Sequence, residues 1–140
     1  MIKAVLDANI FVSAVLKPAG NPGRIIDLAK RDRFKLLLSP DILAEVETVF
    51  SYPRLKKLHN KTPKWIKDFL TELTDKAEIT PGNVVVEVIR SDPSDNIYLS
   101  CALEGRADFI VSGDQHLKDL EVFEAIPIVS PAEFLQVMEG

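Results

Sequence analysis

Carboxylate side chains follow two separate apolar segments of the chain, and this placement could support acid-dependent chemistry. Asp7 comes directly after residues 2–6, and Asp114 lies just past residues 108–112. A single aspartate after a strand is often only a turn or helix-cap residue. If the two segments are parallel strands, however, both side chains lie at the same edge of one sheet, where such sheets bind ligands. This coincidence favours a common functional site over two unrelated caps.

Two further acids lie in segments that we expect to be helical. Asp95 would be the third residue of a helix capped by Asp92, where a carboxylate complements the helix dipole. The rest of that helix is apolar around most of its axis, which predicts burial and a need for a counter-charge near Asp95. Glu45 borders the apolar stripe of a second predicted helix, over 40–50. Glu47 borders the same stripe, and the periodicity does not distinguish these two glutamates.

Several carboxylates at one edge repel one another, and a divalent cation would remove that cost. Oxygen ligands with room for water suit Mg²⁺ or Mn²⁺, whereas Cys101, His59 and His116 show no zinc-like spacing. Such a cation can orient a phosphate and lower the pKa of a bound water. We expect Asn9 and Ser112, which are neighbours of these acids in the sequence, to orient ligands or a phosphate.

The elements that must position these residues alternate along the chain. Strands are expected at residues 2–6, 36–38, 84–89, 108–112 and 126–129. Helices are expected over 10–16, 21–31, 40–50, 63–76, 93–104 and from 131 onward. Most of these helices follow a cap residue and a proline, and Glu133 completes a capping box with Ser130. Asn21 is the expected cap of the second helix, and Gly105 stands at the end of the fifth. Alternating strands and helices predict an α/β fold with a mostly parallel sheet.

Composition limits the classes of protein that this chain can be. It has 140 residues, of which 46% are hydrophobic and 27% charged, and it shows no repeat or linker, so we expect a single domain over 1–140. No apolar run approaches the ~18 residues of a membrane span, and the N-terminus does not resemble a secretory signal. One cysteine allows no intrachain disulfide, which favours the reducing cytoplasm. The net charge of −4 argues against a strongly basic nucleic-acid binder.

Taken together, these residues resemble the PIN-domain nuclease family, which includes VapC-like toxins of toxin–antitoxin modules. The phrases that carry the resemblance are Asp7-Ala8-Asn9-Ile10-Phe11-Val12, Ser39-Pro40 with Glu45, Asp92-Pro93-Ser94-Asp95-Asn96, and Ser112-Gly113-Asp114 with Leu117. The resemblance implies a three-layer α/β/α domain with a mostly parallel central sheet. It also implies a metal-dependent endoribonuclease that uses Asp7, Glu45, Asp95 and Asp114 as catalytic residues and metal ligands. A toxin role, an antitoxin partner and a homodimer are further expectations, with an RNA-processing nuclease as the alternative.

A basic segment complements this expectation. Residues 54–67 carry six lysines and arginines and no acid, although the whole chain is acidic. We expect Lys56, Lys57 and Lys61 to contact RNA phosphates. A solvated face, or a protein-contact face anchored by Trp65, is the alternative interpretation.

Other classes fit the acids less well. A haloacid-dehalogenase-like phosphatase normally has a second aspartate where this chain has Asn9. A receiver-like signalling module needs an acidic pair near the first strand and a lysine after the last, and neither fits well. A non-catalytic module in which the acids hold a structural cation stays open.

Overall fold

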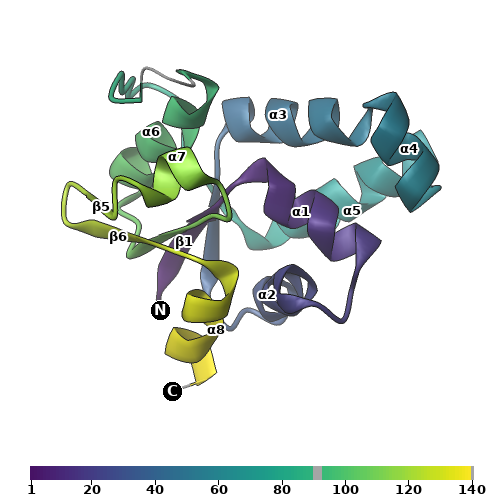
Figure 1. The fold of residues 1–140 in the computed structure, drawn as a ribbon, viewed down its shortest axis with the longest axis horizontal. Coiled ribbons are helices and arrows are strands. Elements are labelled where there is room, and N and C mark those ends of the chain that lie inside the picture. The colour runs from purple at the N-terminus through teal and green to yellow at the C-terminus, as the bar shows by residue number, and fades with distance from the viewer. Residues whose placement is uncertain (90–92, 140) are drawn as a thin grey trace.

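Short apolar runs that are buried on both faces form a parallel sheet at the centre of the molecule. The computed structural model describes residues 1–89 and 93–139. Its strands are β1 (Lys3–Leu6), β2 (Lys35–Leu38), β3 (Glu78–Ile79), β4 (Phe109–Val111), β5 (Val122–Phe123) and β6 (Ile126–Val129). They lie in the order β3-β2-β1-β4-β6-β5, and every neighbouring pair is parallel except β5 with β6 (Figure 1). Because β1 and β4 are adjacent, the residues that follow them meet at one edge of the sheet.

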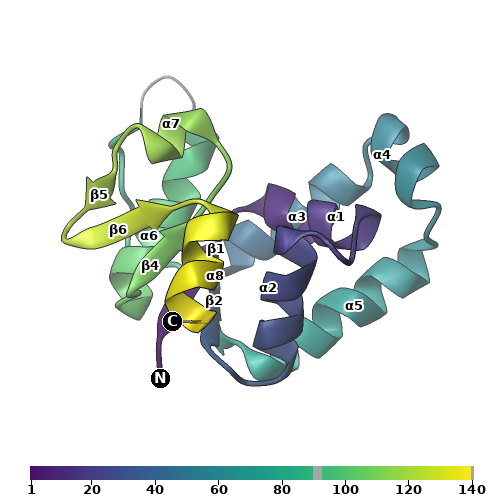
Figure 2. The ribbon, with the colours of Figure 1, turned by 60° about the horizontal axis from the view of Figure 1, so that its bottom comes forward.

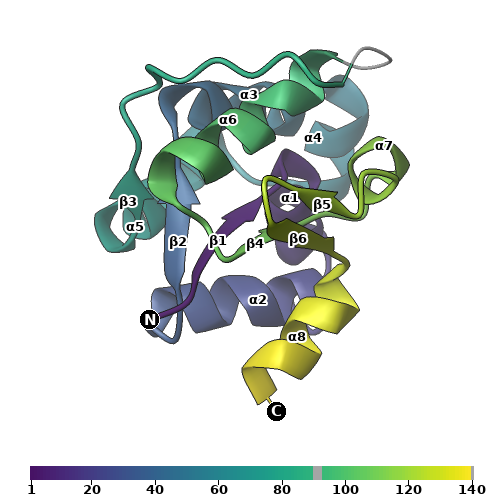
Figure 3. The same ribbon diagram turned by 90° about the vertical axis from the view of Figure 1, so that its left-hand side faces the viewer.

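Helices cover both faces of this sheet. They are α1 (Ala8–Leu16), α2 (Asn21–Lys30), α3 (Pro40–Phe50), α4 (Pro53–His59), α5 (Pro63–Lys76), α6 (Asn96–Gly105), α7 (Gln115–Lys118) and α8 (Pro131–Glu139), with a 3₁₀ turn at Pro93–Asp95. In Figure 3, α6 lies on one side of the strands, whereas α2 and α8 lie on the other. The predicted layers and the mostly parallel sheet are therefore confirmed. In the described ranges, the helices are too short or too polar to cross a membrane.

The helices begin where cap residues satisfy their first N–H groups. The Ser39 hydroxyl accepts from the Ile42 N–H at 3.2 Å, and the Thr62 hydroxyl accepts from the Trp65 N–H at 3.1 Å. A reciprocal capping box forms around Ser130, whose N–H donates to the Glu133 carboxylate. The second helix departs from expectation, since Asn21 is already helical and Gly20 is the cap residue. Asp92, the expected cap of the fifth helix, lies outside the described residues, and that segment starts as the 3₁₀ turn.

Residues 84–89, which we predicted to be a strand, do not join the sheet. The edge of β2 is instead taken by β3, a two-residue strand that the sequence pattern did not reveal. The 84–89 segment runs beside α6 and bonds to its side chains. The N–H of Val86 donates to the Ser100 hydroxyl at 3.0 Å, and the Asn96 amide oxygen accepts from Ile89 at 2.8 Å. Helix α6 thus satisfies backbone groups that a strand would pair within a sheet.

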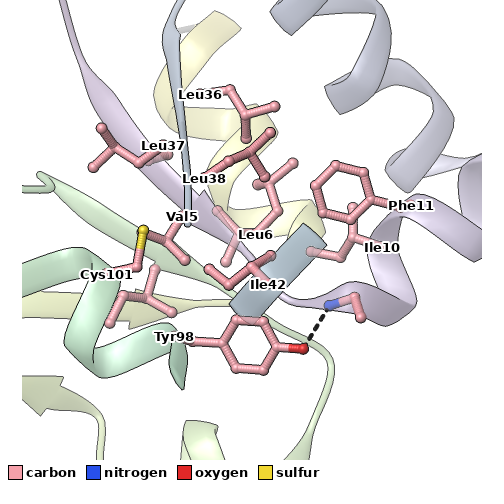
Figure 4. Close-up of a cluster of buried hydrophobic side chains, with 14 of the residues drawn as sticks. Val5, Leu6, Ile10, Phe11, Leu36, Leu37, Leu38, Ile42, Tyr98 and Cys101 are labelled. Atoms are coloured by element: carbon pink, nitrogen blue, oxygen red, sulfur yellow. Dashed lines mark hydrogen bonds between the residues drawn. The ribbon is translucent and has the colours of Figure 1, made fainter. Parts of the chain in front are cut away.

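The hydrophobic core joins β1 and β2 to helices on both sides. Figure 4 shows Val5 and Leu6 of β1 among residues of β2, α1, α3 and α6. Tyr98 of α6 is buried in this cluster, and its hydroxyl accepts a hydrogen bond from the Ala8 N–H at 3.0 Å. This bond ties the start of α1 to α6 next to the end of β1.

The arm (residues 47–70) extends away from this centre. It comprises the last turn of α3, all of α4 and the first half of α5. Figures 1 and 2 both show α4 at the far side of the molecule from α7. Helix α4 itself was not predicted, because its basic residues show no clear apolar stripe.

Candidate active site

The first carboxylate is built into the junction between β1 and α1. Asp7 is the N-cap residue of α1, and its Oδ1 accepts from the N–H groups of Asn9 at 2.9 Å and Ile10 at 3.3 Å. The Asp7 side chain is almost completely buried. Asp7 can therefore act both as a helix cap and as a functional carboxylate. Capping fixes its Oδ1, whereas its Oδ2 faces the end of β4.

A single serine hydroxyl connects the first carboxylate to the second. Ser112 is fully buried at the end of β4, and its Oγ donates to Oδ2 of Asp7. The Ser112 Oγ also accepts a hydrogen bond from the Asp114 N–H at 2.9 Å. Asp114 caps the short helix α7 through bonds from the His116 and Leu117 N–H groups at 2.8 and 3.3 Å. Ser112 thus holds both aspartates in register.

The other two acids, Glu45 and Asp95, lie close enough to Asp7 and Asp114 to interact with the same neighbouring groups. Ligand atoms of Asp95, Asp114 and His116 all lie within 4.8 Å of one another. Besides burial, the negative charges of Asp7, Glu45 and Asp95 contribute to the raised pKa of the Tyr98 phenol. Glu45 is half-buried on α3, whereas Asp95 is buried where α6 begins. The structure therefore brings all four predicted carboxylates together, although their catalytic and metal-binding roles stay predictions.

A cleft of about 400 Å³ opens beside this cluster. Asp7, Asn9, Asp114 and Gln115 are among the residues that line it. Asn9 is exposed and lines this cleft, and its backbone N–H donates to Oδ1 of Asp7. A phosphodiester entering this cleft would meet both aspartates.

Burial dominates the electrostatics of the cluster. Burial raises the pKa of the Asp7 carboxyl above its ordinary value, and the negative charge of Asp114 adds to that rise. The hydrogen bonds from Ser112, Ile10 and Asn9 act in the opposite direction. Burial also raises the pKa of the Tyr98 phenol, and the surrounding carboxylates reinforce the effect. Cation binding would relieve this accumulation of negative charge.

Two residues of the cluster were not chosen from the sequence. Tyr98 was interpreted only as part of an apolar helix, although it lies one turn after Asp95 and so shares its side of α6. His116 was considered only for zinc-like spacing and was not among the residues predicted for the site. Its Nδ1 lies 3.9 Å from Oδ1 of Asp114. Its position two residues after Asp114 was the sequence signal that could have placed His116 in the site.

The three lysines predicted to bind RNA do not border this cleft. Lys56 and Lys57 lie on α4, and Lys61 lies in the turn before α5, all within the arm. Contact with an RNA held in the cleft would require these lysines to lie close to its edge. Figures 1 and 2 instead show α4 beyond the far end of α3. Their contact with RNA stays a prediction.

Comparisons with known proteins identify the family. A family model described as PIN domain matches residues 3–116, which include all four acids. The chain belongs to the PIN-domain family. It is also 32% identical over 146 residues to the uncharacterized protein MJ1680 of Methanocaldococcus jannaschii, covering 99% of this chain and 92% of that protein.

A solved structure shares the fold. The crystal structure of VapBC2 from Rickettsia felis, bound to a DNA fragment from their promoter, matches with a TM-score of 0.61. The match covers 92% of this chain and 98% of that chain at 16% sequence identity. PIN domains are nucleases that use divalent metals, and the acidic cluster provides a donor set of that kind. The resemblance to PIN proteins inferred from the sequence is confirmed.

Proposed function

We propose that this PIN domain is a metal-dependent endoribonuclease that hydrolyses phosphodiester bonds in RNA. The observation that carries the proposal is the grouping of Asp7, Glu45, Asp95 and Asp114 in one cluster, two of whose members, Asp7 and Asp114, line the cleft. Burying several like charges costs free energy that a merely structural site has no reason to incur. Hydrolysis of a phosphodiester is chemistry that uses such a cluster.

The residues present fit Mg²⁺ or Mn²⁺. Carboxylate oxygens form most of the donor set, which suits these hard cations, and the imidazole of His116 is a ligand that Mn²⁺ also accepts. Asp7, Glu45, Asp95 and Asp114 would hold the cation. Bound there, it would supply positive charge that orients a phosphate and lowers the pKa of water.

The chain's own residues prepare the site for this role. Ser112 and two backbone N–H groups bond to the Asp7 carboxylate and favour its ionised form against the cost of burial. Ser112 also fixes the backbone of Asp114. The exposed Asn9 side chain can donate to a phosphate oxygen at the cleft wall.

Cleavage of a labelled single-stranded RNA tests this proposal. We expect cleavage with Mn²⁺ or Mg²⁺, none in EDTA, and products that end in 5′-phosphate and 3′-hydroxyl. Asp7→Asn should abolish cleavage, because it removes a charge while keeping the shape. Asp119→Asn is the matched control, since Asp119 is an exposed carboxylate just past α7. Cyclic phosphate ends, or full activity in EDTA, would reject the mechanism.

We further propose that the enzyme is the toxin of a toxin–antitoxin pair and forms a homodimer in the cytoplasm. The support is the sequence resemblance to VapC-like toxins, together with the fold shared with VapBC2. Induction in the native host should stop growth, and co-expression of a small protein encoded by a neighbouring gene should restore it. Growth that continues despite active enzyme would assign the chain to RNA processing. Light scattering of the purified protein would establish the mass of the assembly.

A further inference from the structure

A second cavity, of about 530 Å³, lies within the arm and shares no lining residue with the acidic cleft. Phe50, Ile66 and Leu70 form its apolar floor, and all three are buried. Lys56 and Lys67 stand on its rim, and both are exposed. The cavity therefore combines an apolar pocket with a positively charged mouth.

Local hydrogen bonds hold the walls of this cavity in place. His59 is buried between the end of α3 and the turn before α5. Its Nε2 lies 3.1 Å from the Phe50 carbonyl oxygen, and its Nδ1 accepts from the Lys61 N–H at 2.9 Å. Nδ1 therefore carries no proton, and Nε2–H donates to the carbonyl. A pocket fixed in this way needs little rearrangement to receive a ligand.

The charge around the mouth is not neutralised within the described residues. Lys64 pairs with Asp68 at 2.9 Å, but no carboxylate lies within 4.0 Å of the ammonium groups of Lys56, Lys57 or Lys67. Among the residues that line the cavity, the one acid is Glu47. A ligand that brings several negative charges would find partners here.

The aromatic rings that line the cavity are already covered by other side chains. Phe50 packs edge-to-face on His59 and on Phe69, with centroids 5.6 and 6.2 Å apart. Trp65 stacks on Phe69, and the Lys61 ammonium lies 4.6 Å from the centre of its ring. Proteins that bind single-stranded nucleic acid offer open ring faces on which bases stack. Phe50 and His59, the rings that line the cavity, are buried and offer no such face, which favours another acidic ligand over RNA at this cavity.

We propose that this cavity binds an acidic peptide segment of a partner protein, with one bulky apolar side chain inserted onto Phe50, Ile66 and Leu70. Glutamates or aspartates beside that side chain pair with Lys56 and Lys67 at the rim. The apolar insertion provides most of the affinity, and the lysines provide orientation and selection for acidic sequences. The proposal concerns a surface apart from the acidic cleft and holds whether or not the chain cleaves RNA.

Fluorescence anisotropy with a labelled synthetic peptide tests it on the full chain. The probe carries several glutamates on each side of one central phenylalanine, and a second probe has serine in place of that phenylalanine. We expect the phenylalanine probe to bind about tenfold tighter or more, because burying a large apolar side chain contributes about 1.5–3 kcal/mol. Equal binding of the two probes would overturn the proposal.

Two pairs of lysine substitutions locate the binding site. Lys56→Ala with Lys67→Ala should weaken the phenylalanine probe about fivefold, since two exposed charge pairs are lost. Lys57→Ala with Lys64→Ala is the matched control, because it removes the same charge from the same two helices without touching the lining. We expect this control to change affinity less than about twofold. If both double substitutions weaken binding equally, the peptide is attracted by the general positive charge and not bound at this cavity, which would contradict the proposal.

A third variant separates peptide from RNA. Ser51→Trp leaves the charge unchanged and fills the cavity from an exposed lining position. It should weaken the phenylalanine probe about tenfold and leave the serine probe unchanged. If oligouridylate binds more tightly than the phenylalanine probe, and only the Lys56 and Lys67 pair reduces that binding, the rim serves RNA and the proposal is wrong. Self-association that this lysine pair abolishes would instead identify a second copy of the chain as the occupant, against the proposal.

Discussion

Replacement of Ser112 by alanine is the sharpest test of how the candidate site is assembled. The Ser112 hydroxyl is fully buried, donates to Asp7 and accepts from the Asp114 N–H at 2.9 Å. Ser112→Ala deletes one oxygen atom and two hydrogen bonds. It leaves a buried carboxylate oxygen and a partly buried N–H group without their partner.

The expected cost follows from these two bonds. A hydrogen bond to a charged group contributes about 1.5–3 kcal/mol, and one between neutral groups about 0.5–1.5 kcal/mol. Ser112→Ala should therefore lower the free energy of unfolding by about 2–4 kcal/mol. Because the Ser112 bond lowers the pKa of Asp7, its loss raises that pKa further. The acidic limb of the cleavage rate against pH should then move to higher pH.

Urea denaturation in EDTA at neutral pH measures the stability change, and cleavage rates across pH measure the shift. Ser100→Ala is the control, since the Ser100 hydroxyl accepts one bond, from Val86 at 3.0 Å, away from the acidic cluster. It should cost about 0.5–1.5 kcal/mol and leave the pH profile in place. If Ser112→Ala costs no more than Ser100→Ala and the acidic limb does not move, Ser112 does not organise the two aspartates.

Three further substitutions test the same structure. Because burial raises the pKa of Asp7, the contribution of this carboxyl to the free energy of unfolding falls as the pH rises from the ordinary carboxyl pKa through the raised one. Asp7→Asn should therefore make the metal-free protein more stable at neutral pH. Urea titrations should show that this gain vanishes near about pH 4. Tyr98→Phe leaves the buried Ala8 N–H without its acceptor and should cost about 1–3 kcal/mol in thermal denaturation; an unchanged melting temperature would refute that role. Gly105→Ala places a Cβ 2.8 Å from a Leu37 methyl group, so we expect a loss of about 1–3 kcal/mol by calorimetry, where an open helix position would gain stability.

Local rules explain what could be predicted from the sequence. Two kinds of local signal act over only a few neighbouring residues, so they can be recognised before the fold is known. They are the buried runs that form β1, β2, β4 and β6, and the cap residues Ser39, Thr62 and Ser130. The order of strands and helices also predicted a parallel sheet, because such connections need a crossover. The positions of Asp7 and Asp114 after β1 and β4 then predicted that they would meet at one edge.

Contacts between distant segments had to await the tertiary structure. Residues 84–89 have the β-branched, apolar composition of a strand, but a strand forms only where a sheet edge is open, and β3 occupies the edge of β2. Periodicity did not choose between Glu45 and Glu47; packing of α3 and α6 placed Glu45 within range of Tyr98 and left Glu47 at the cavity of the arm. That Ser112 joins two aspartates, and that the basic arm lies far from them, follow from how the elements pack in three dimensions. The sequence therefore determined which residues are candidates for the chemistry, and tertiary packing decided which of them meet, because burial and charge act through space.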